Sequence, residues 1–222
     1  SWSMEKSVTA VLIGMLVADG RLKLDDPAPI PEWQSPGDPR RNITLRHLLH
    51  MASGLDHTEG LDPDQPGEIY DGDTARMLFL DGADDMARYA ESRPMEARAG
   101  EKFEYSSATS VILADIIARE LTDSKNPRVR MEAVRRFAYG RLFEPLRMTS
   151  ARIEFDRAGT MIGGSMMHAT ARDWAKFGEF LRNGGSIGGA QIIPRKWIEF
   201  MRTPSPTNAV YGGHIWLNAR AG

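Results

Sequence analysis

The sequence predicts an α+β fold in which helices predominate and strands are few. Two segments, 148–155 and 211–218, have the composition expected of short strands. Elsewhere apolar residues recur at i, i+3, i+4 and i+7, which is the spacing of helices that bury one face. This spacing occurs within 8–16, 111–121, 129–142, 171–181 and 195–201.

Composition narrows the classes of function. Hydrophobic residues make up 41% and charged residues 26% of the 222 residues, which is ordinary for a globular protein. A net charge of −2 gives no reason to expect a nucleic-acid partner. Because the chain has no Cys, a disulfide framework, a thiolate metal site and a cysteine nucleophile are excluded. No apolar run has the length of a membrane span, and the compartment stays open between cytoplasm and periplasm.

A helix is predicted over residues 4–19, with apolar positions 8, 11, 12, 15 and 16 on one face and Gly20 as its stop. Ser3 then sits at its N-terminus with Lys6 one turn on, on the same side. A serine hydroxyl is a weak nucleophile until a base takes its proton. A lysine beside an apolar face loses hydration, so its pKa falls and it can be that base. The amide of Ser3 would help to hold a developing oxyanion.

The same residues also have a purely structural interpretation. Ser3 would then cap the helix, and Lys6 would be a solvated residue of the first turn. The pattern Ser-x-x-Lys is common by chance, so it does not choose between the two.

Between the first helix and residue 107 the sequence predicts short helices joined by irregular segments. Prolines at 27, 29, 31, 36 and 39 stiffen a surface connection. Helices are predicted over 45–51, 73–80 and 83–92, the first two capped by Thr44 and Asp73. The segment 55–73 is rich in Asp, Gly and Pro and predicts a long loop of the kind that often carries function.

The histidines of this region do not predict a metal site. His47 and His50 lie one turn apart and His57 follows, but no third ligand stands at a convincing helical offset. We therefore expect no metal and no other cofactor.

The C-terminal half alternates helices with glycine-rich turns. Ser106 and Ser107 open an apolar helix that Asn126-Pro127 separates from the next. Thr170 caps the helix over 171–181, and the glycines after it end that helix. The stretch 160–167, rich in Gly and Met, fits either a pocket wall or a turn in the core.

In this order, several motifs resemble the serine β-lactamase-like hydrolases. That superfamily includes class C β-lactamases, D-alanyl-D-alanine peptidases (penicillin-binding-protein-like enzymes), β-lactamase-fold esterases and 6-aminohexanoate-dimer hydrolase. The motifs are SMEKS at 3–7, LKLDDP at 22–27, ITLRHLL at 43–49, SGL at 53–55, GEKFEYSS at 100–107 and ATARDW at 169–174. Each is weak alone, and their order and spacing make the signal strong.

The resemblance implies roles for three residues. Ser3 would be the nucleophile and Lys6 its base, and Tyr105 would relay a proton to the leaving group and back from water. The family motif Tyr-x-Asn is here Tyr105-Ser106-Ser107. The amide that Ser107 replaces contacts the acylamino side chain of β-lactam substrates, so an esterase or amidase is favoured over a true β-lactamase.

The resemblance also implies the architecture: a helical domain and an antiparallel sheet with flanking helices. The strands expected before Ser3, and the third motif (Lys-Thr-Gly or His-x-Gly) expected near the C-terminus, do not occur in the sequence. We therefore expect 1–222 to be one β-lactamase-like domain, incomplete at both ends and lacking much of the sheet. Residues 25–170 would form its mostly helical subdomain.

Two classes of function follow. The first is a hydrolase that forms an acyl-enzyme on Ser3 and cleaves a small ester or amide, with Ser107 among the residues that contact it. Other residues expected to line its pocket, or else the core, are Trp2, Met167, His168, Tyr211 and Trp216. The second is a weak or inactive relative that binds peptide or peptidoglycan. A triad with His168 or His57 as base is a third interpretation, weakened because no Gly-x-Ser-x-Gly motif occurs.

Overall fold

A computed structural model describes residues 1–60 and 72–218, and in these residues helices predominate, as the sequence predicts. The chain order is α1 (Glu5–Ala18), η1 (Pro31–Trp33), η2 (Pro39–Asn42), α2 (Leu45–Leu49), α3 (Asp73–Phe79), α4 (Met86–Glu91), α5 (Ser107–Leu121), α6 (Pro127–Ala138), the π-turn η3 (Tyr139–Phe143), α7 (Ala171–Arg182), β1 (Ser186–Ile187), β2 (Ala190–Gln191) and α8 (Arg195–Arg202). None of the helices described is both long and apolar enough to cross a membrane.

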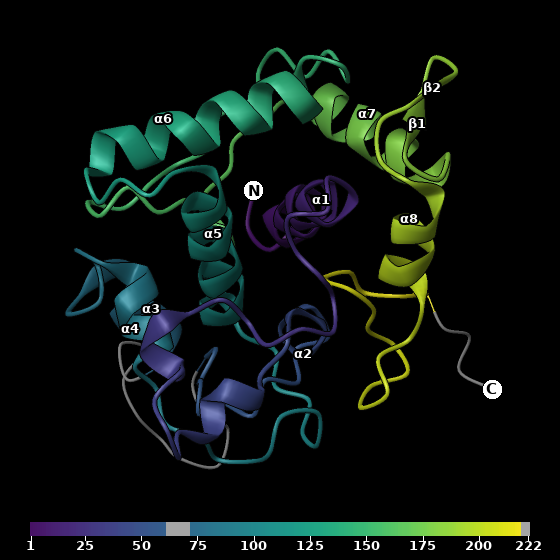
Figure 1. The fold of residues 1–222 in the computed structure, drawn as a ribbon. Coiled ribbons are helices and arrows are strands. Elements are labelled where there is room, and N and C mark those ends of the chain that lie inside the picture. The colour runs from purple at the N-terminus through teal and green to yellow at the C-terminus, as the bar shows by residue number, and fades with distance from the viewer. Residues whose placement is uncertain (61–71, 219–222) are drawn as a thin grey trace.

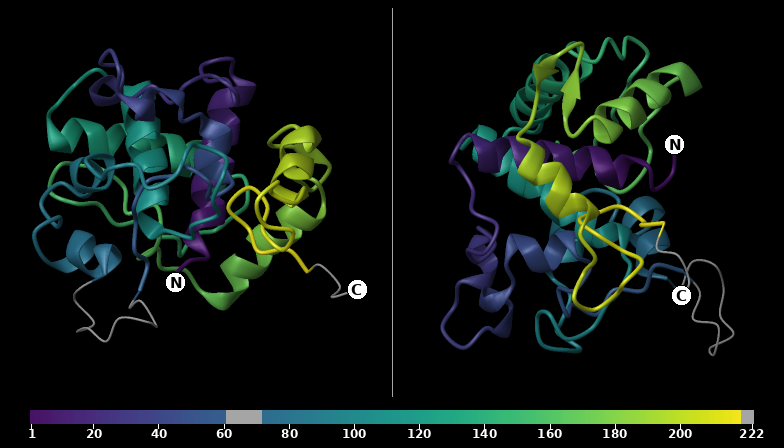
Figure 2. Two further views of the ribbon diagram at one scale, coloured as in Figure 1. Left: turned by 90° about the horizontal axis from the view of Figure 1, so that it is seen from below. Right: turned by 90° about the vertical axis from the view of Figure 1, so that its right-hand side faces the viewer.

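Helix α1 lies in the middle of the molecule, with α5 on one side and α8 on the other (Figure 1). The prediction that it buries only one face is wrong, because every residue from Glu5 to Leu16 except Ser7 is buried. Trp197 of α8 packs so closely on Gly14 that a Cβ there would lie 2.2 Å from the indole ring. Its indole N–H donates to the carbonyl of Ala10 at 3.1 Å, which fixes α8 across α1 (Figure 2).

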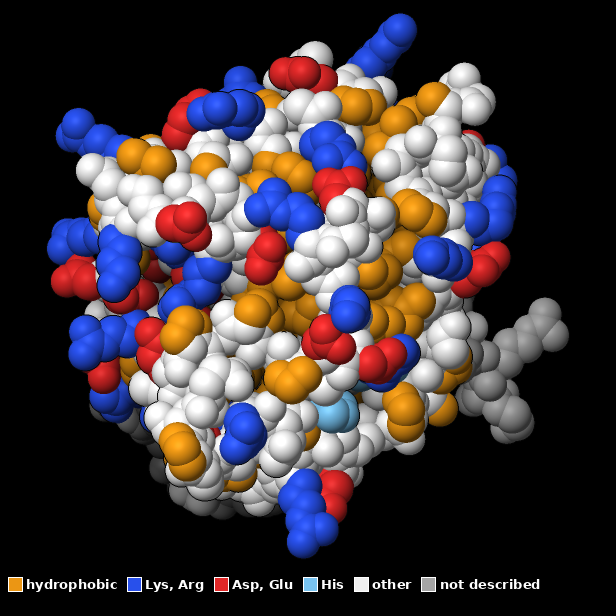
Figure 3. All heavy atoms as spheres, in the orientation of Figure 1, with side chains coloured by type: hydrophobic (Ala, Val, Ile, Leu, Met, Phe, Trp, Pro, Cys, Tyr) orange, Lys and Arg blue, Asp and Glu red, His pale blue; other side chains and the backbone are white. Residues whose placement is uncertain are grey.

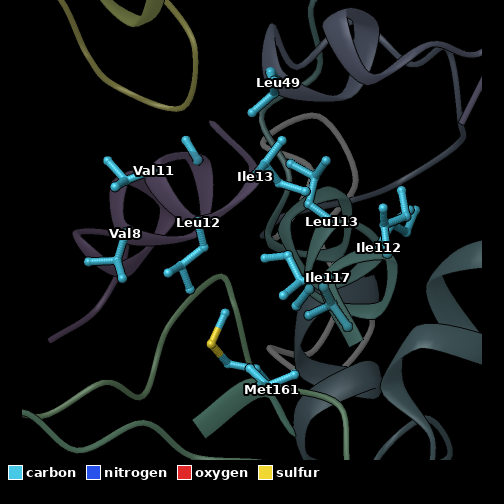
Figure 4. Packing of buried hydrophobic residues seen from close by; sticks show 14 of the residues in the cluster. Val8, Val11, Leu12, Ile13, Leu49, Ile112, Leu113, Ile117 and Met161 are labelled. Atoms are coloured by element: carbon cyan, nitrogen blue, oxygen red, sulfur yellow. The ribbon is translucent and has the colours of Figure 1, made fainter. Parts of the chain in front are cut away.

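The α1–α5 interface forms the centre of the hydrophobic core. Leu12 and Ile13 of α1 lie opposite Leu113 and Ile117 of α5, and Met161 closes the group from below (Figure 4). Burying such apolar side chains stabilises a fold by about 25 cal/mol for each Å² of apolar surface removed from water. The rigid contact matters for function because the first turns of both helices carry the candidate site.

The described sheet is a single antiparallel hairpin, in which Ser186 pairs with Gln191 and Ile187 with Ala190. The two predicted strands are wrong. Residues 148–155 make only isolated bridges, of Arg152 with His168 and of Phe155 with Met161. Residues 211–218 form a tight turn closed by a bridge between Tyr211 and Trp216. Without a neighbouring strand among the described residues, neither segment has a partner for a ladder.

The other helices lie close to the predicted ranges. Thr44 caps α2 through a capping box with His47, as the sequence indicates. Gly72 rather than Asp73 occupies the cap position of α3. The helix expected over 83–92 is shorter, because Asp85 caps it at Met86. Of the loop predicted over 55–73, residues 61–71 lie outside the described residues.

Candidate active site

The first turn of α1 presents Ser3 and Lys6 to each other. Lys6 Nζ lies 3.1 Å from Ser3 Oγ, and the Lys6 amide donates to the Ser3 carbonyl at 3.1 Å. Met4 holds the helix cap position without a side-chain hydrogen bond, so the Ser3 hydroxyl does not serve as the cap. The structural interpretation of the motif as cap and solvated lysine is therefore wrong.

Lys6 is a buried amine, with 1% of its surface exposed. Besides Ser3, its Nζ contacts Ser107 Oγ at 2.7 Å and the carbonyl oxygen of Gly164 at 2.9 Å. Burial lowers the pKa of Lys6 to about 8, while the carboxylates of Glu59 and Glu5 act in the opposite direction. A large neutral fraction is thus present slightly above neutral pH, which suits a general base.

Tyr105 lies beside Ser3 in the same pocket, just before α5. Lys6 Nζ stands 5.0 Å from the centre of its ring. Burial raises the pKa of Tyr105, and a hydrogen bond with Ser3 opposes this rise. The phenol therefore keeps its proton at neutral pH and is placed to donate it. The three residues predicted to carry the chemistry are brought together at one point.

Ser107 is the first residue of α5 and links Lys6 to a carboxylate that the sequence analysis missed. Its hydroxyl donates to Glu59 Oε1 at 2.7 Å, and its amide donates to Glu59 Oε2 at 2.5 Å. Thr74 Oγ1 also donates to Oε2, at 2.7 Å. Glu59 thus occupies the positive N-terminal end of a long helix.

A pocket of about 350 Å³ opens on these groups. Its walls include Tyr105, Tyr211, Ile215 and Trp216 beside Ser3 and Lys6. Tyr105 and Trp216 lie with ring centres 5.3 Å apart, and Tyr211 meets Trp216 edge to face at 4.8 Å. Trp216 is 55% exposed and Met4, which also lines the pocket, is 52% exposed, so the mouth is apolar. Figure 3 shows the other side of the molecule, toward which the C-terminal end of α1 points, and apolar side chains are exposed near the middle of that face as well.

The other residues proposed for the pocket lie elsewhere. Met167 is fully buried in the core, and His168 is exposed, with its backbone paired to Arg152. Trp2 is 75% exposed and does not line the pocket described here. In the stretch 160–167 it is the backbone of Gly164, not a side chain, that reaches the site.

The histidines do not supply a base for Ser3. His57 is buried against the carbonyl of Ala90, with its Nε2 3.1 Å from that oxygen. His168 is exposed, with its backbone paired to Arg152. Separately, no group of three potential metal ligands is found among residues 1–60 and 72–218. The triad interpretation with His57 or His168 is therefore wrong.

His214 holds the pocket loop in place and was also missed. Its Nδ1 lies 3.0 Å from the carbonyl of Leu49, which only accepts, so Nδ1 carries the proton and Nε2 accepts from Ser110 Oγ at 2.9 Å. Burial lowers the pKa of His214 to about 3, so it stays neutral. Its own carbonyl accepts from Ser7 Oγ at 2.8 Å, which ties the loop to α1.

The chain is similar to known proteins both in sequence and in structure. A family profile described as Beta-lactamase matches residues 1–219. A 6-aminohexanoate-dimer hydrolase of Paenarthrobacter ureafaciens is 26% identical over 202 residues, which are 89% of this chain and 48% of that protein. The structure of a Bacillus anthracis protein proposed to be a 6-aminohexanoate-dimer hydrolase superposes with a TM-score of 0.75 at 21% identity, covering 99% of this chain and 58% of that one.

A D-stereospecific amidohydrolase of Streptomyces sp. superposes with a TM-score of 0.63 at 20% identity, covering 96% of this chain and 68% of that one. These superpositions establish the fold, and it is the one that the motifs predicted. The chain spans about half the length of the curated relative that it matches.

Proposed function

This chain belongs to the β-lactamase family, and on that premise we propose that it is the catalytic part of a serine hydrolase that forms an acyl-enzyme on Ser3. The observation that carries the proposal is the 3.1 Å contact between Ser3 Oγ and a buried Lys6. Burying a lysine amine costs free energy, and buried lysines with lowered pKa values are concentrated at functional sites.

The reaction proceeds in two steps. Neutral Lys6 takes the proton of Ser3 as the hydroxyl oxygen attacks the substrate carbonyl. The amide of Ser3 stabilises the resulting oxyanion. Tyr105 then gives a proton to the leaving amine or alcohol and takes one back from protonated Lys6, so the acyl-enzyme remains with Lys6 neutral again. Water, deprotonated through the same two residues, hydrolyses the ester bond to Ser3 and restores the enzyme.

The proposed substrates are small amides or esters with an apolar group next to the reacting carbonyl. The relatives named above support amides, since one hydrolyses the 6-aminohexanoate dimer by name and another is an amidohydrolase. The aromatic pocket of Tyr105, Tyr211 and Trp216 supports the apolar group. Ser107 in place of the usual asparagine argues against β-lactams as preferred substrates.

The non-catalytic alternative is a scaffold that binds peptide without cleaving it. It does not require Lys6 to be buried with its amine aimed at Ser3, and so the geometry favours hydrolysis.

The test is covalent labelling and turnover in the full-length protein. We expect a fluorophosphonate to label Ser3 and p-nitrophenyl butyrate to give a burst of acylation, both lost in Ser3→Ala. Ser35→Ala, an exposed serine outside the pocket, is the control. Labelling that persists in Ser3→Ala would remove Ser3 from this role, and nitrocefin should be turned over weakly or not at all.

A further inference from the structure

Glu59 contacts Ser107 through both of its oxygens and does not touch the nucleophile. We propose that Glu59 is a positioning residue: by accepting a hydrogen bond from the Ser107 hydroxyl, it fixes the direction of the hydrogen bonds around Lys6 so that the lone pair of Lys6 faces Ser3. This inference rests on the proposed function of Lys6 as base.

The direction of each bond follows from the groups involved. A carboxylate only accepts, so the hydroxyl proton of Ser107 must point to Glu59 Oε1, 2.7 Å away. Only lone pairs of Ser107 Oγ then face Lys6 Nζ, at 2.7 Å. The carbonyl oxygen of Gly164, 2.9 Å from Nζ on another side, also only accepts.

Neutral Lys6 has two protons and one lone pair. The two protons are taken by the two acceptors, Ser107 Oγ and Gly164 O, and the lone pair is left for the third neighbour, Ser3 Oγ at 3.1 Å. If the Ser107 hydroxyl turned around, it would donate into that lone pair, and Lys6 would offer Ser3 an N–H instead of a base. The carboxylate prevents this turn.

The substitution Glu59→Gln reverses the direction of these bonds at nearly constant shape. The Ser107 amide can only donate, so it takes the single oxygen of the new side chain, replacing its 2.5 Å bond to Oε2. The new NH₂ group then faces Ser107 Oγ and donates to it. The displaced hydroxyl proton turns toward Lys6 and occupies its lone pair.

The decisive experiment is a double-mutant cycle on the acylation burst with p-nitrophenyl butyrate in the full-length protein. We expect Glu59→Gln to lower the acylation rate about 10- to 100-fold, which is part of the roughly 100- to 10,000-fold that general acid–base catalysis supplies. In a Ser107→Ala background no hydroxyl can turn around, so adding Glu59→Gln should change the rate less than about threefold. Glu132→Gln, an exposed residue of α6, is the matched control.

Rates are compared on the alkaline plateau, because Glu59 also acts on Lys6 as a charge. Removing its carboxylate should shift the acid limb of the pH profile to lower pH, since Glu59 raises the pKa of Lys6. The other titratable groups around Lys6 are Glu5, Tyr105 and His214. Glu59 also raises the pKa of Tyr105, so the plateau is read below the pH at which Tyr105 loses its proton. On the plateau Lys6 is neutral in every variant, so a lower plateau reports geometry and not titration.

Two results would overturn the inference while leaving the hydrolase intact: a plateau in Glu59→Gln equal to that of the parent, or an equal loss with and without the Ser107 hydroxyl. Thermal unfolding of each variant shows whether it is folded, and a folded Glu59→Gln protein with a lowered plateau is the expected result. A burst that survives Ser3→Ala would instead overturn the proposed function.

Discussion

The pH dependence of acylation follows from the burial of Lys6. With the pKa of Lys6 lowered to about 8, roughly one tenth of the amine is neutral at pH 7 and roughly nine tenths at pH 9. The acylation rate should therefore rise about tenfold between these pH values and then level off. An ordinary lysine, with its pKa near 10.5, would be neutral about 300 times less often than Lys6 at pH 7.

The measurement is the burst rate with p-nitrophenyl butyrate from pH 6 to pH 10, corrected for spontaneous hydrolysis. Lys6→Arg keeps the charge but cannot lose a proton in this range, so its burst should be absent at every pH. A burst rate whose pH profile reports a pKa near 6.5, or a Lys6→Arg variant with a normal burst, would refute the assignment of the base.

The same shift has a consequence for stability. Because the pKa of Lys6 is lower in the folded protein than in the unfolded chain, the unfolded chain binds more protons between pH 8 and pH 10.5. The free energy of unfolding should rise over this window by up to about 3 kcal/mol from Lys6 alone. Denaturant unfolding of the parent and of Lys6→Met measures this change. The free energy of unfolding of the parent should rise relative to that of the variant as the pH rises. An equal pH dependence of the two proteins would contradict the burial of the charge.

Two further predictions concern packing and a buried carboxyl. A Cβ at Gly163 would lie 2.8 Å from the carbonyl oxygen of Ser110, so Gly163→Ala should lower the free energy of unfolding by about 1–3 kcal/mol. Gly178 faces open space in α7, so Gly178→Ala should raise the free energy of unfolding slightly. Thermal unfolding of both variants measures the difference. Burial, together with the nearby charge of Asp115, raises the pKa of Glu91 above its value in the unfolded chain. The unfolded chain therefore loses this proton first, and the free energy of unfolding falls as the pH rises above about 4.5. Glu91→Gln should therefore be more stable than the parent at pH 8 and gain little at pH 5; a constant difference would argue against a protonated Glu91.

The proposed nucleophile and base could be predicted from the sequence because their relation is local. Ser3 and Lys6 are three residues apart, and helical geometry alone brings them to one side. Tyr105 was found only through the family resemblance, because no periodicity links it to α1. The surrounding helices were predicted for the same local reason. The strand predictions for 148–155 and 211–218 failed, since a strand requires a partner elsewhere in the chain.

Glu59 was missed because it lies in a long polar loop, where a carboxylate is unremarkable. A signal was nevertheless present: Ser107 stands where the family has an asparagine, and a hydroxyl, unlike an amide, can turn to donate or to accept. With Lys6 in its proposed role, such a replacement calls for a group that fixes the hydroxyl, and an acceptor should be sought among the loops near that helix. Glu59 supplies that acceptor across 48 residues of sequence.

The burial that lowers the pKa of Lys6 is also a long-range property. Two of its three Nζ contacts come from distant parts of the chain, Ser107 of α5 and the carbonyl of Gly164. The glycine was visible in the sequence, but sequence patterns describe side chains, and what reaches the lysine here is a backbone oxygen. It reaches so far because Gly164 has no Cβ, which would lie 3.0 Å from the Ser107 carbonyl oxygen. The pKa of Lys6 is thus set by the packing of α5 and the 160–167 segment on α1, and substitutions that loosen this packing should move the acid limb toward higher pH before they abolish the fold.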